Sequence, residues 1–436
     1  MPQENKKKER VKKMIKFGKW VVKFRIPILI LSFLLLIPTG IIYMNTRINY
    51  DILSYLPGDI ETMKGQDILL DEFGTGAFSV AVIDGMQEKE ISQLEDKLKE
   101  IDHVKDVLWY GALADISIPM DMLPDDLKDS LQNADTGSQL MIITFDTSMS
   151  ADETLDAIEE IRGLTNEQCL LSGMSAVVTD IKKICNSEVI MYVVIAAGLS
   201  ALVLALTMDS FLLPFIFLLS IGMAIVYNLG TNFIAGEISF VTQALAAVLQ
   251  LAVTMDYSIF LWHSYLENQE RYPDDRKRAM SHAISQTLTS VVGSSITTIA
   301  GFLAMCFMTF TLGMDLGVVM AKGVVFGVIG CVTILPSMIL AMDKWIEKTR
   351  HKAIIPDLGR IGGFVTKHYW IFIILFLVII GPAFYGQNHN QVYYDLMGTL
   401  PDNLESVKAG NALENDFDMG ATHVILASSD LNSKDA

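Results

Sequence analysis

Seven apolar segments dominate the sequence and restrict what the chain can fold into. The hydrocarbon core of a bilayer is about 30 Å thick, so a helix needs roughly 20 apolar residues to cross it. Each segment is close to that length. In addition, only 19% of the 436 residues are charged, whereas an ordinary soluble domain has about 25% charged residues. The sequence therefore predicts an α-helical polytopic membrane protein and excludes an ordinary soluble enzyme. The predicted spans are 26–45, 187–207, 210–233, 239–263, 286–308, 318–341 and 368–386.

The charged residues indicate how these spans are oriented. Residues 1–25 contain ten Lys or Arg and two Glu, whereas residues 46–186 contain 28 Asp or Glu and ten Lys or Arg. Because Lys and Arg collect on the cytoplasmic side, we expect a multi-pass protein of the cell (inner) membrane with a cytoplasmic N-terminus and an extracytoplasmic block 46–186. The net charge of −17 argues against nucleic acid as a partner. The leader 1–25 has two interpretations, a basic amphipathic helix on the inner leaflet or an unstructured charged flank.

The extracytoplasmic block alternates strand and helix patterns, which suggests two βαβ units and an α+β ferredoxin-like sandwich. His103 is its only histidine, so neither a histidine-based triad nor a multi-histidine metal site is available. We therefore expect no enzyme activity, no metal and no cofactor. Whether Cys169 and Cys185 pair stays open. The expected strands are 77–83, 104–109, 139–145 and 169–172, and the expected helices are 91–101, 151–161 and a short one within 112–133.

An internal repeat organises the whole chain. Residues 50–57 (YDILSYLP) recur as 394–401 (YDLMGTLP), and the offset of 344 persists without a gap from Lys23/Lys367 to Gly76/Gly420. One unit comprises a span, an extracytoplasmic domain and five further spans. Two complete copies would need roughly 690 residues, so we expect a chain truncated after the start of its second copy.

The predicted division follows from the spans and the repeat. We expect a further strand, 423–427, early in the second extracytoplasmic domain. The expected parts are a leader (1–25), span one (26–45), an extracytoplasmic domain (46–186), a bundle of spans two to six (187–341), a cytoplasmic linker (342–367), span seven (368–386) and the start of a second extracytoplasmic domain (387–436).

Asp256 is the residue of the spans that most suggests function. A charged side chain at the bilayer centre costs about 2.5–3.5 kcal/mol on insertion scales, and a low dielectric raises a carboxyl pKa toward neutrality. Such a carboxyl can load and release protons. Tyr257 shares a helix face with Gln250 and Thr254, and His263 lies seven residues beyond Asp256, so we expect a polar seam along this helix. His263 is interpreted either as an interfacial residue or as part of the relay.

The fifth span supplies a run of small and hydroxylated residues. These either continue a hydrated path from the fourth span or allow close helix packing. The residues are Ser294, Ser295, Thr297 and Thr298. In the sixth span, Gly323 and Gly327 are expected to serve packing. Lys322 is expected to extend toward the interface, with a buried counter-charge as the alternative.

Taken together, these motifs resemble the resistance-nodulation-division (RND) superfamily, in particular its mycobacterial membrane protein large (MMPL) and hydrophobe/amphiphile exporter branch. The resemblance rests on 254–261 (TMDYSIFL), 294–302 (SSITTIAGF), Leu335-Pro336, and the Leu-Pro pairs that follow spans one and seven. It implies a transporter driven by the proton-motive force, with hydrophobic or lipidic cargo. The Asp-Tyr relay pair of the family would be Asp256 and Tyr257.

The resemblance also sets expectations about partners and mechanism. Family members complete the relay with a matching span from a second half, so the partners would be the bilayer, the cargo, and the missing half or oligomeric partners. Protonation of Asp256 would shift helix packing and rock the extracytoplasmic domain through the linkers after span one and before span two. Spans two to six also resemble a sterol-sensing module, so the alternative is a lipid sensor that transports nothing.

Overall fold

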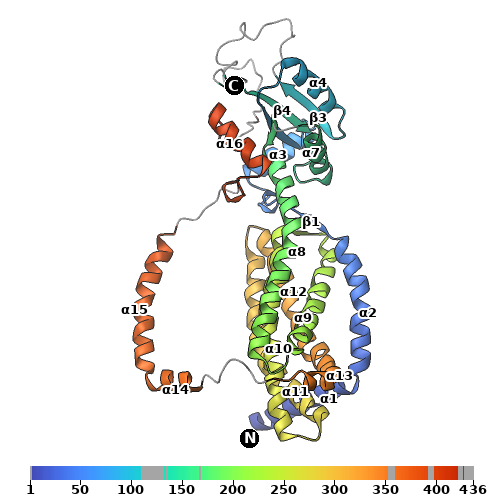
Figure 1. The fold of residues 1–436 in the computed structure, drawn as a ribbon, viewed down its shortest axis with the longest axis vertical. Coiled ribbons are helices and arrows are strands. Elements are labelled where there is room, and N and C mark those ends of the chain that lie inside the picture. Colours follow the sequence, from blue (N-terminus) through green and yellow to red (C-terminus); the bar gives the residue numbers. More distant parts are fainter. Residues whose placement is uncertain are drawn as a thin grey trace.

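The computed structural model describes residues 2–109, 132–133, 136–165, 168–351, 359–390, 397–420 and 426. A bundle of long helices lies below a smaller α+β domain, and one helix stands apart from the bundle (Figure 1). Most of the expected short helix within 112–133 and of the expected strand 423–427 lies outside the described residues.

Within the described residues, seven helical segments are long and apolar enough to cross a membrane, which agrees with the predicted number of spans. All but one belong to the bundle. Five single helices are α2 (Arg25–Met44), α8 (Met174–Thr207), α9 (Leu213–Gly230), α10 (Phe240–Arg271) and α11 (Arg276–Ala304); α12 (Leu312–Val332) with α13 (Ile334–Lys348) makes the sixth segment, and α15 (Tyr369–Asn388) the seventh.

The sixth segment is not the single straight helix expected for 318–341. Pro336 has no N–H to donate to the carbonyl of Val332, and its ring crowds that carbonyl. The ladder therefore breaks at Thr333 (φ −124°, ψ −59°), where α12 ends and α13 begins. Helix α13 continues to Lys348, and α14 covers Gly359–Lys367, so the expected linker 342–367 is partly helical.

The basic leader forms helix α1 (Pro2–Lys23), so it is helical rather than unstructured, and its position on the inner leaflet stays a prediction. It packs against α11 and α13, with Val21 and Val22 buried. Gly18 allows the close approach, because a Cβ there would lie 2.4 Å from the backbone oxygen of Ser281.

The α+β domain has the βαββαβ order and the strand order β3-β4-β2-β5 of a ferredoxin-like fold. Neighbouring strands are antiparallel; Ala81 of β2, for example, lies opposite Met141 of β4 and Leu171 of β5. The four predicted strands have the observed bounds, because their apolar patterns are short and clearly bounded. The elements are β2 (Ala77–Ile83), α4 (Glu88–Lys99), β3 (Val104–Trp109), β4 (Gln139–Phe145), α7 (Asp152–Leu164) and β5 (Cys169–Ser172). Cys169 and Cys185 are free thiols.

Helices cover both faces of this sheet. Successive strand residues point to opposite faces: Ala81 and Ile83 of β2 pack in the core beneath α4 and α7, whereas Val80 and Val82 pack on the other side with Leu413. Leu413 belongs to α16 (Glu405–Phe417), which lies in the second copy of the repeat. The second copy therefore completes the domain of the first.

An ion-pair network holds the start of α16 in place. Arg162 donates to both carboxylate oxygens of Asp180 (2.7 and 3.1 Å), and its Nε lies 3.2 Å from Oε2 of Glu405. The Ser406 N–H donates to the same Asp180 carboxylate at 3.1 Å. Because Asp180 and Ser406 are buried, this network exchanges little with water.

No linker separates the α+β domain from the second span. Helix α8 has 34 residues, about 50 Å at 1.5 Å per residue, and so exceeds the bilayer core. Its first turns pack inside the domain, where Val177 and Ile181 contact Tyr50 and Leu155. One continuous helix thus connects the domain to the bundle.

A short parallel pair of strands joins the first and fourth spans next to the domain. Strand β1 (Arg47–Asn49) follows α2, and β6 (Glu237–Ser239) precedes α10. Asn49 donates a 3.0 Å hydrogen bond to the Glu237 carboxylate. The start of α10 is also capped from α12, because Asp315 accepts from the Ser239 N–H (2.9 Å) and the Thr242 hydroxyl (2.5 Å).

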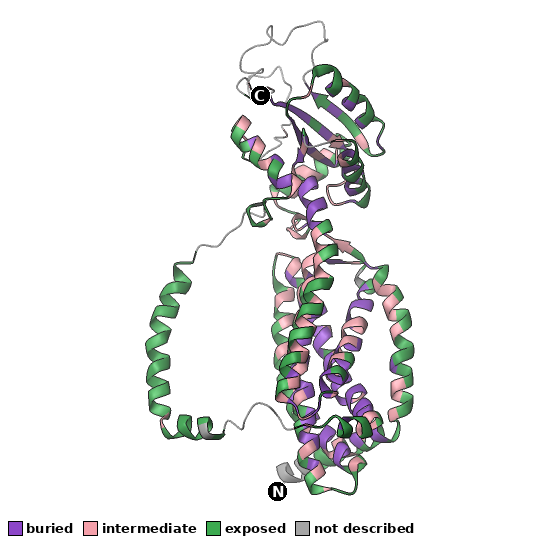
Figure 2. Ribbon diagram, viewed as in Figure 1, coloured by how far each residue is buried: buried purple, intermediate pink, exposed green. Residues whose placement is uncertain are grey.

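Two glycines bring α12 against α10. A Cβ at Gly323 would lie 3.0 Å from Oε1 of Gln250 in α10 and 2.7 Å from Nδ2 of Asn228 in α9, and one at Gly327 would overlap the Thr254 side chain. The expectation that these glycines serve packing agrees with this geometry. Helix α15, by contrast, is exposed along its whole length (Figure 2).

Gly327→Ala should destabilise the bundle, because the added methyl group collides with Thr254. Overpacking of this kind typically costs about 1–3 kcal/mol. Gly301→Ala in α11 is the matched control: a Cβ there meets nothing within 4 Å, and Ala is favoured over Gly in a helix by about 1 kcal/mol. Thermal unfolding in detergent should give a lower midpoint for the first variant and an equal or higher one for the second.

Arg162→Met should loosen α16, since it leaves the Asp180 carboxylate buried without its cation. Breaking a buried pair costs about 3–5 kcal/mol, whereas Lys182→Met, which removes a more exposed pair with Asp152, should cost about 0–1 kcal/mol. Amide hydrogen exchange across 405–417 should accelerate only in the first variant. Equal exchange in both would contradict the assigned role of the network.

Candidate functional site

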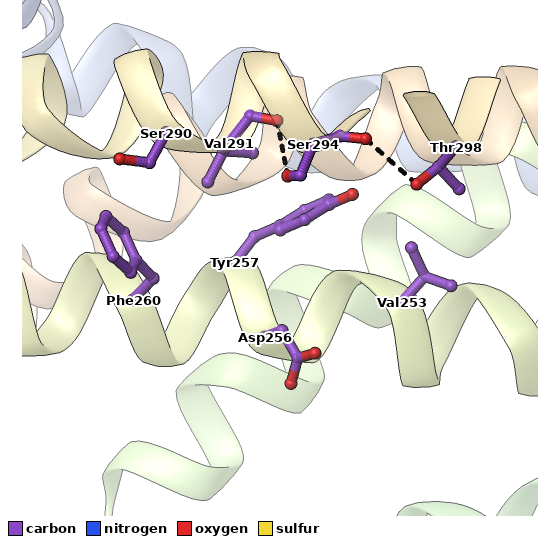
Figure 3. A pocket seen from close by; sticks show the side chains of 8 residues that line it. All are labelled: Val253, Asp256, Tyr257, Phe260, Ser290, Val291, Ser294 and Thr298. Atoms are coloured by element: carbon purple, nitrogen blue, oxygen red, sulfur yellow. Dashed lines mark hydrogen bonds between the residues drawn. The ribbon is translucent and has the colours of Figure 1, made fainter. Parts of the chain in front are cut away.

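The predicted relay pair lies midway along α10, but its two side chains point in different directions. Adjacent residues of a helix differ by about 100°. Tyr257 points toward α11 and is 7% exposed, whereas Asp256 points away from α11 and is exposed in this chain (Figure 3). Helices α8, α9, α11 and α12 all pack against α10, and Asp256 stays exposed among them.

An open groove of about 380 Å³ lies between α10 and α11. Its lining residues are Val253, Asp256, Tyr257, Phe260, Ser290, Val291, Ser294 and Thr298. Tyr257 points toward α11, whereas the Asp256 carboxylate points away from it (Figure 3). The groove can therefore hold water or a lipid chain beside the Tyr257 phenol, with Asp256 as the next residue of α10.

The hydroxyls of α11 bond to their own helix. Ser294 donates to the Val291 carbonyl (3.0 Å) and Thr298 to the Ser294 carbonyl (3.2 Å) (Figure 3). Ser295 donates to the Val291 carbonyl and is buried, whereas Thr297 donates to the Gly293 carbonyl and is exposed. Ser294 and Thr298 thus line the groove, while Ser295 and Thr297 do not.

Gln250 and Thr254 of α10 do not line the groove. Both are buried against α12 at the two glycines. Gln250 accepts a 3.0 Å hydrogen bond from Asn228 of α9, and the Thr254 hydroxyl donates to the Gln250 carbonyl (2.6 Å). Gln250 and Thr254 therefore belong to a buried polar group where α10 packs on α12, and Asp256 is not part of it.

His263 lies on the exposed side of α10, seven residues beyond Asp256, and is not among the groove residues. The structure therefore divides the predicted residues into a group that lines the groove, which includes Asp256 and Tyr257, and an inner group, Gln250 and Thr254, that packs against α12. Within the described part of the chain, no three His, Cys, Asp or Glu side chains are grouped to hold a metal.

Three further polar residues of the bundle, Asn228, Asn232 and Asp315, were not predicted. Lys322 of α12, which the sequence had singled out, donates to Asn232, which follows α9, and Asn228 bonds to Gln250. Asp315 caps α10. Asp315 and Lys322 are seven residues apart on one helix, and Asn228 and Asn232 are four apart. Both spacings place polar residues on a common face, a signal that could have found them.

A cluster of ion pairs lies at the end of the bundle farthest from the α+β domain. Arg276 pairs with Asp343 and with Glu347 (3.0 Å), and Arg350 pairs with Asp209 at 3.1 Å. Trp262 of α10 donates to the same Asp209 carboxylate at 2.9 Å. The end of α10 is therefore tied to the loop between α8 and α9 and to the chain after α13.

Comparisons with known proteins agree with this architecture. The chain is 24% identical over 370 residues to MmpL12 of Mycobacterium tuberculosis, which is described as a probable transport protein; the match covers 81% of this chain and 30% of that protein. It is 31% identical over 129 residues to the Streptomyces coelicolor membrane protein ActII-3, covering 29% of this chain and 18% of that protein. The chain thus spans about a third or less of the length of these relatives.

A crystal structure of SecDF in a super-membrane-facing form matches with a TM-score of 0.39 and 13% identity, over 75% of this chain and 39% of that one. The model of the MMPL family matches residues 74–368, which are 295 of the 436 residues. The chain therefore belongs to the MMPL family.

Proposed function

We propose that this protein forms part of a pump that uses the proton-motive force to export hydrophobic or lipidic molecules across the inner membrane, with its N-terminus in the cytoplasm. The observation that carries the proposal is Asp256 beside Tyr257 on the open groove of α10. Membership of the MMPL family, seven spans and the transport function attributed to MmpL12 support it.

The position of Asp256 makes its charge state depend on what lies against α10. An ionised carboxylate facing lipid is costly, by about 2.5–3.5 kcal/mol at the bilayer centre on insertion scales. Protonation removes that cost, and so does a polar partner. We propose that a matching span of a second repeat covers this flank, and that proton binding at Asp256 changes how tightly the two surfaces pack.

The bundle has a route by which such a change could reach the α+β domain. Helix α10 is fastened at one end by the Asp315 cap and at the other by Trp262 and Asp209. Asp209 follows the end of α8, and α8 runs without a break into the domain. In the proposed cycle a tilt of α10 moves α8 and, with it, the α+β domain that handles the cargo.

A lipid sensor is the second candidate, and the lateral opening of the groove favours it. Val253, Phe260 and Val291 offer an apolar surface that is open to the side of the bundle, as a membrane lipid would require. A sensor needs no net proton movement. Proton flux therefore separates the two candidates.

Asp256→Asn should abolish proton flux and cargo movement in proteoliposomes, because the amide has nearly the shape of the carboxyl but does not take up a proton near neutral pH. Folding should be unchanged, since Asp256 forms no hydrogen bond or ion pair with the described residues. Glu267→Gln is the control: it removes an exposed carboxylate eleven residues further along α10.

The readout is the decay of an imposed pH gradient, followed with a trapped dye, in proteoliposomes that contain the protein. Flux at the level of protein-free liposomes in Asp256→Asn, with normal flux in the control, supports the relay. Undiminished flux in Asp256→Asn would refute it. A wild-type protein that binds lipid but moves no protons would instead favour the sensor.

A further inference from the structure

The outer face of helix α1 carries four lysines, which we call the lysine stripe. Their spacings of four, three and four residues place them on one face of the helix, opposite to the face that packs on α11 and α13. All four are exposed, and none forms an ion pair within the described residues. The stripe is therefore a row of free positive charge. Its residues are Lys12, Lys16, Lys19 and Lys23.

Three aromatic side chains run beside the lysine stripe. Phe17, Trp20 and Phe24 stack in series, with ring centroids 6.1 and 5.6 Å apart. Trp20 is 50% exposed and Phe24 is 38% exposed, and Nζ of Lys23 lies 5.4 Å from the centre of the Phe24 ring. Aromatic rings next to lysines are typical of the lipid–water interface, where the rings lie among the headgroups and the ammonium groups reach the phosphates. This combination indicates a partner surface that is anionic and partly apolar.

Helix α1 is held where a lipid surface would lie. It leads directly into α2, the first span, and it lies at the end of the bundle farthest from the α+β domain (Figure 1). Gly18 brings its backbone against Ser281 of α11, and the Thr289 hydroxyl donates to the Met14 sulfur at 3.2 Å. These contacts fix which face of α1 turns outward, so the lysines form a fixed array.

The positive charge continues from α1 onto the bundle. Lys19 interacts electrostatically with His282 of α11, and Arg271 and Arg278 act on the same imidazole. Arg271 is paired with Glu267, whereas Lys19 and Arg278 form no ion pair within the described part of the chain. Grouped like charges repel one another. An anionic group placed beside Lys19 and Arg278 would remove that repulsion.

We propose that α1 and the adjoining start of α11 bind anionic phospholipids of the leaflet on this side of the membrane. The lysine stripe and Arg278 pair with lipid phosphates, while Trp20 and Phe24 pack among the headgroups. Because α1 packs on α11, which lines the groove beside Tyr257, the bound lipid also holds α11 in place. The binding needs neither proton movement nor cargo, so it is independent of the proposed transport.

Lipid retention tests this binding. The protein is placed in nanodiscs with equal parts of phosphatidylcholine and phosphatidylglycerol, and native mass spectrometry counts the lipids that stay bound after release into detergent. Lys→Gln at all four positions of the lysine stripe should lower the number of retained phosphatidylglycerol molecules several-fold, whereas Lys→Arg at the same positions should preserve it. The other basic residues of the leader remain and keep the orientation of the first span.

The matched control removes the same amount of charge elsewhere. It changes to Gln four exposed lysines of the α+β domain and its neighbouring helices, and it should retain as much phosphatidylglycerol as the wild type. Equal retention in the stripe variant and the wild type, or an equal loss in the control, would overturn the proposal. The control lysines are Lys64, Lys89, Lys97 and Lys408.

Hydrogen exchange gives a second readout at the helix itself. Amides of residues 9–23 should exchange several-fold more slowly in nanodiscs that contain phosphatidylglycerol than in phosphatidylcholine alone, because bound lipid opposes the opening of α1. High salt should reduce the difference, since it screens exposed charges. The same protection by inorganic phosphate, or no difference between the two lipid compositions, would contradict a lipid site. Asp256→Asn should leave both readouts unchanged, which separates this test from that of proton coupling.

Discussion

The close contact between α10 and α12 determines the orientation of the site. Gly323 and Gly327 let the backbone of α12 approach the buried side chains of Gln250 and Thr254. Packing at small residues drives helix association in a bilayer, where the hydrophobic effect between helices is absent. Once this face of α10 is turned inward, helical geometry turns Tyr257 toward α11 and leaves Asp256 exposed and pointing away from α11.

Polar groups inside the bundle serve mostly to hold helix ends and helix pairs. Asp315 caps α10, Asn228 bonds to Gln250 and Lys322 bonds to Asn232. In hydrocarbon, an unsatisfied polar group costs several kcal/mol, so these pairs restrict the relative positions of α9, α10 and α12. Asp256 is outside this network, which leaves it available for exchange with whatever covers the groove.

The elements of this fold were more predictable from the sequence than their orientation. The strands of the α+β domain and the number of spans follow from local apolar patterns, and their assignment held. The break at Thr333 was missed although Pro336 signals it, because the apolar run continues through it. The exposure of Asp256 and the packing of α16 on the sheet depend on contacts between distant segments, which local patterns do not encode. The pairing of Asp256 with Tyr257 as a relay stays a prediction.

The parallel pair of β1 and β6 has a consequence for how motion can spread. It ties the exit of the first span to the entry of the fourth through backbone hydrogen bonds and the Asn49–Glu237 contact. The polypeptide enters the α+β domain directly after β1 and leaves it through α8. A displacement of the fourth span, α10, would therefore move both connections of the α+β domain to the bundle, β1 and α8, at the same time. The domain would then rotate as a rigid unit about the β1–β6 pair.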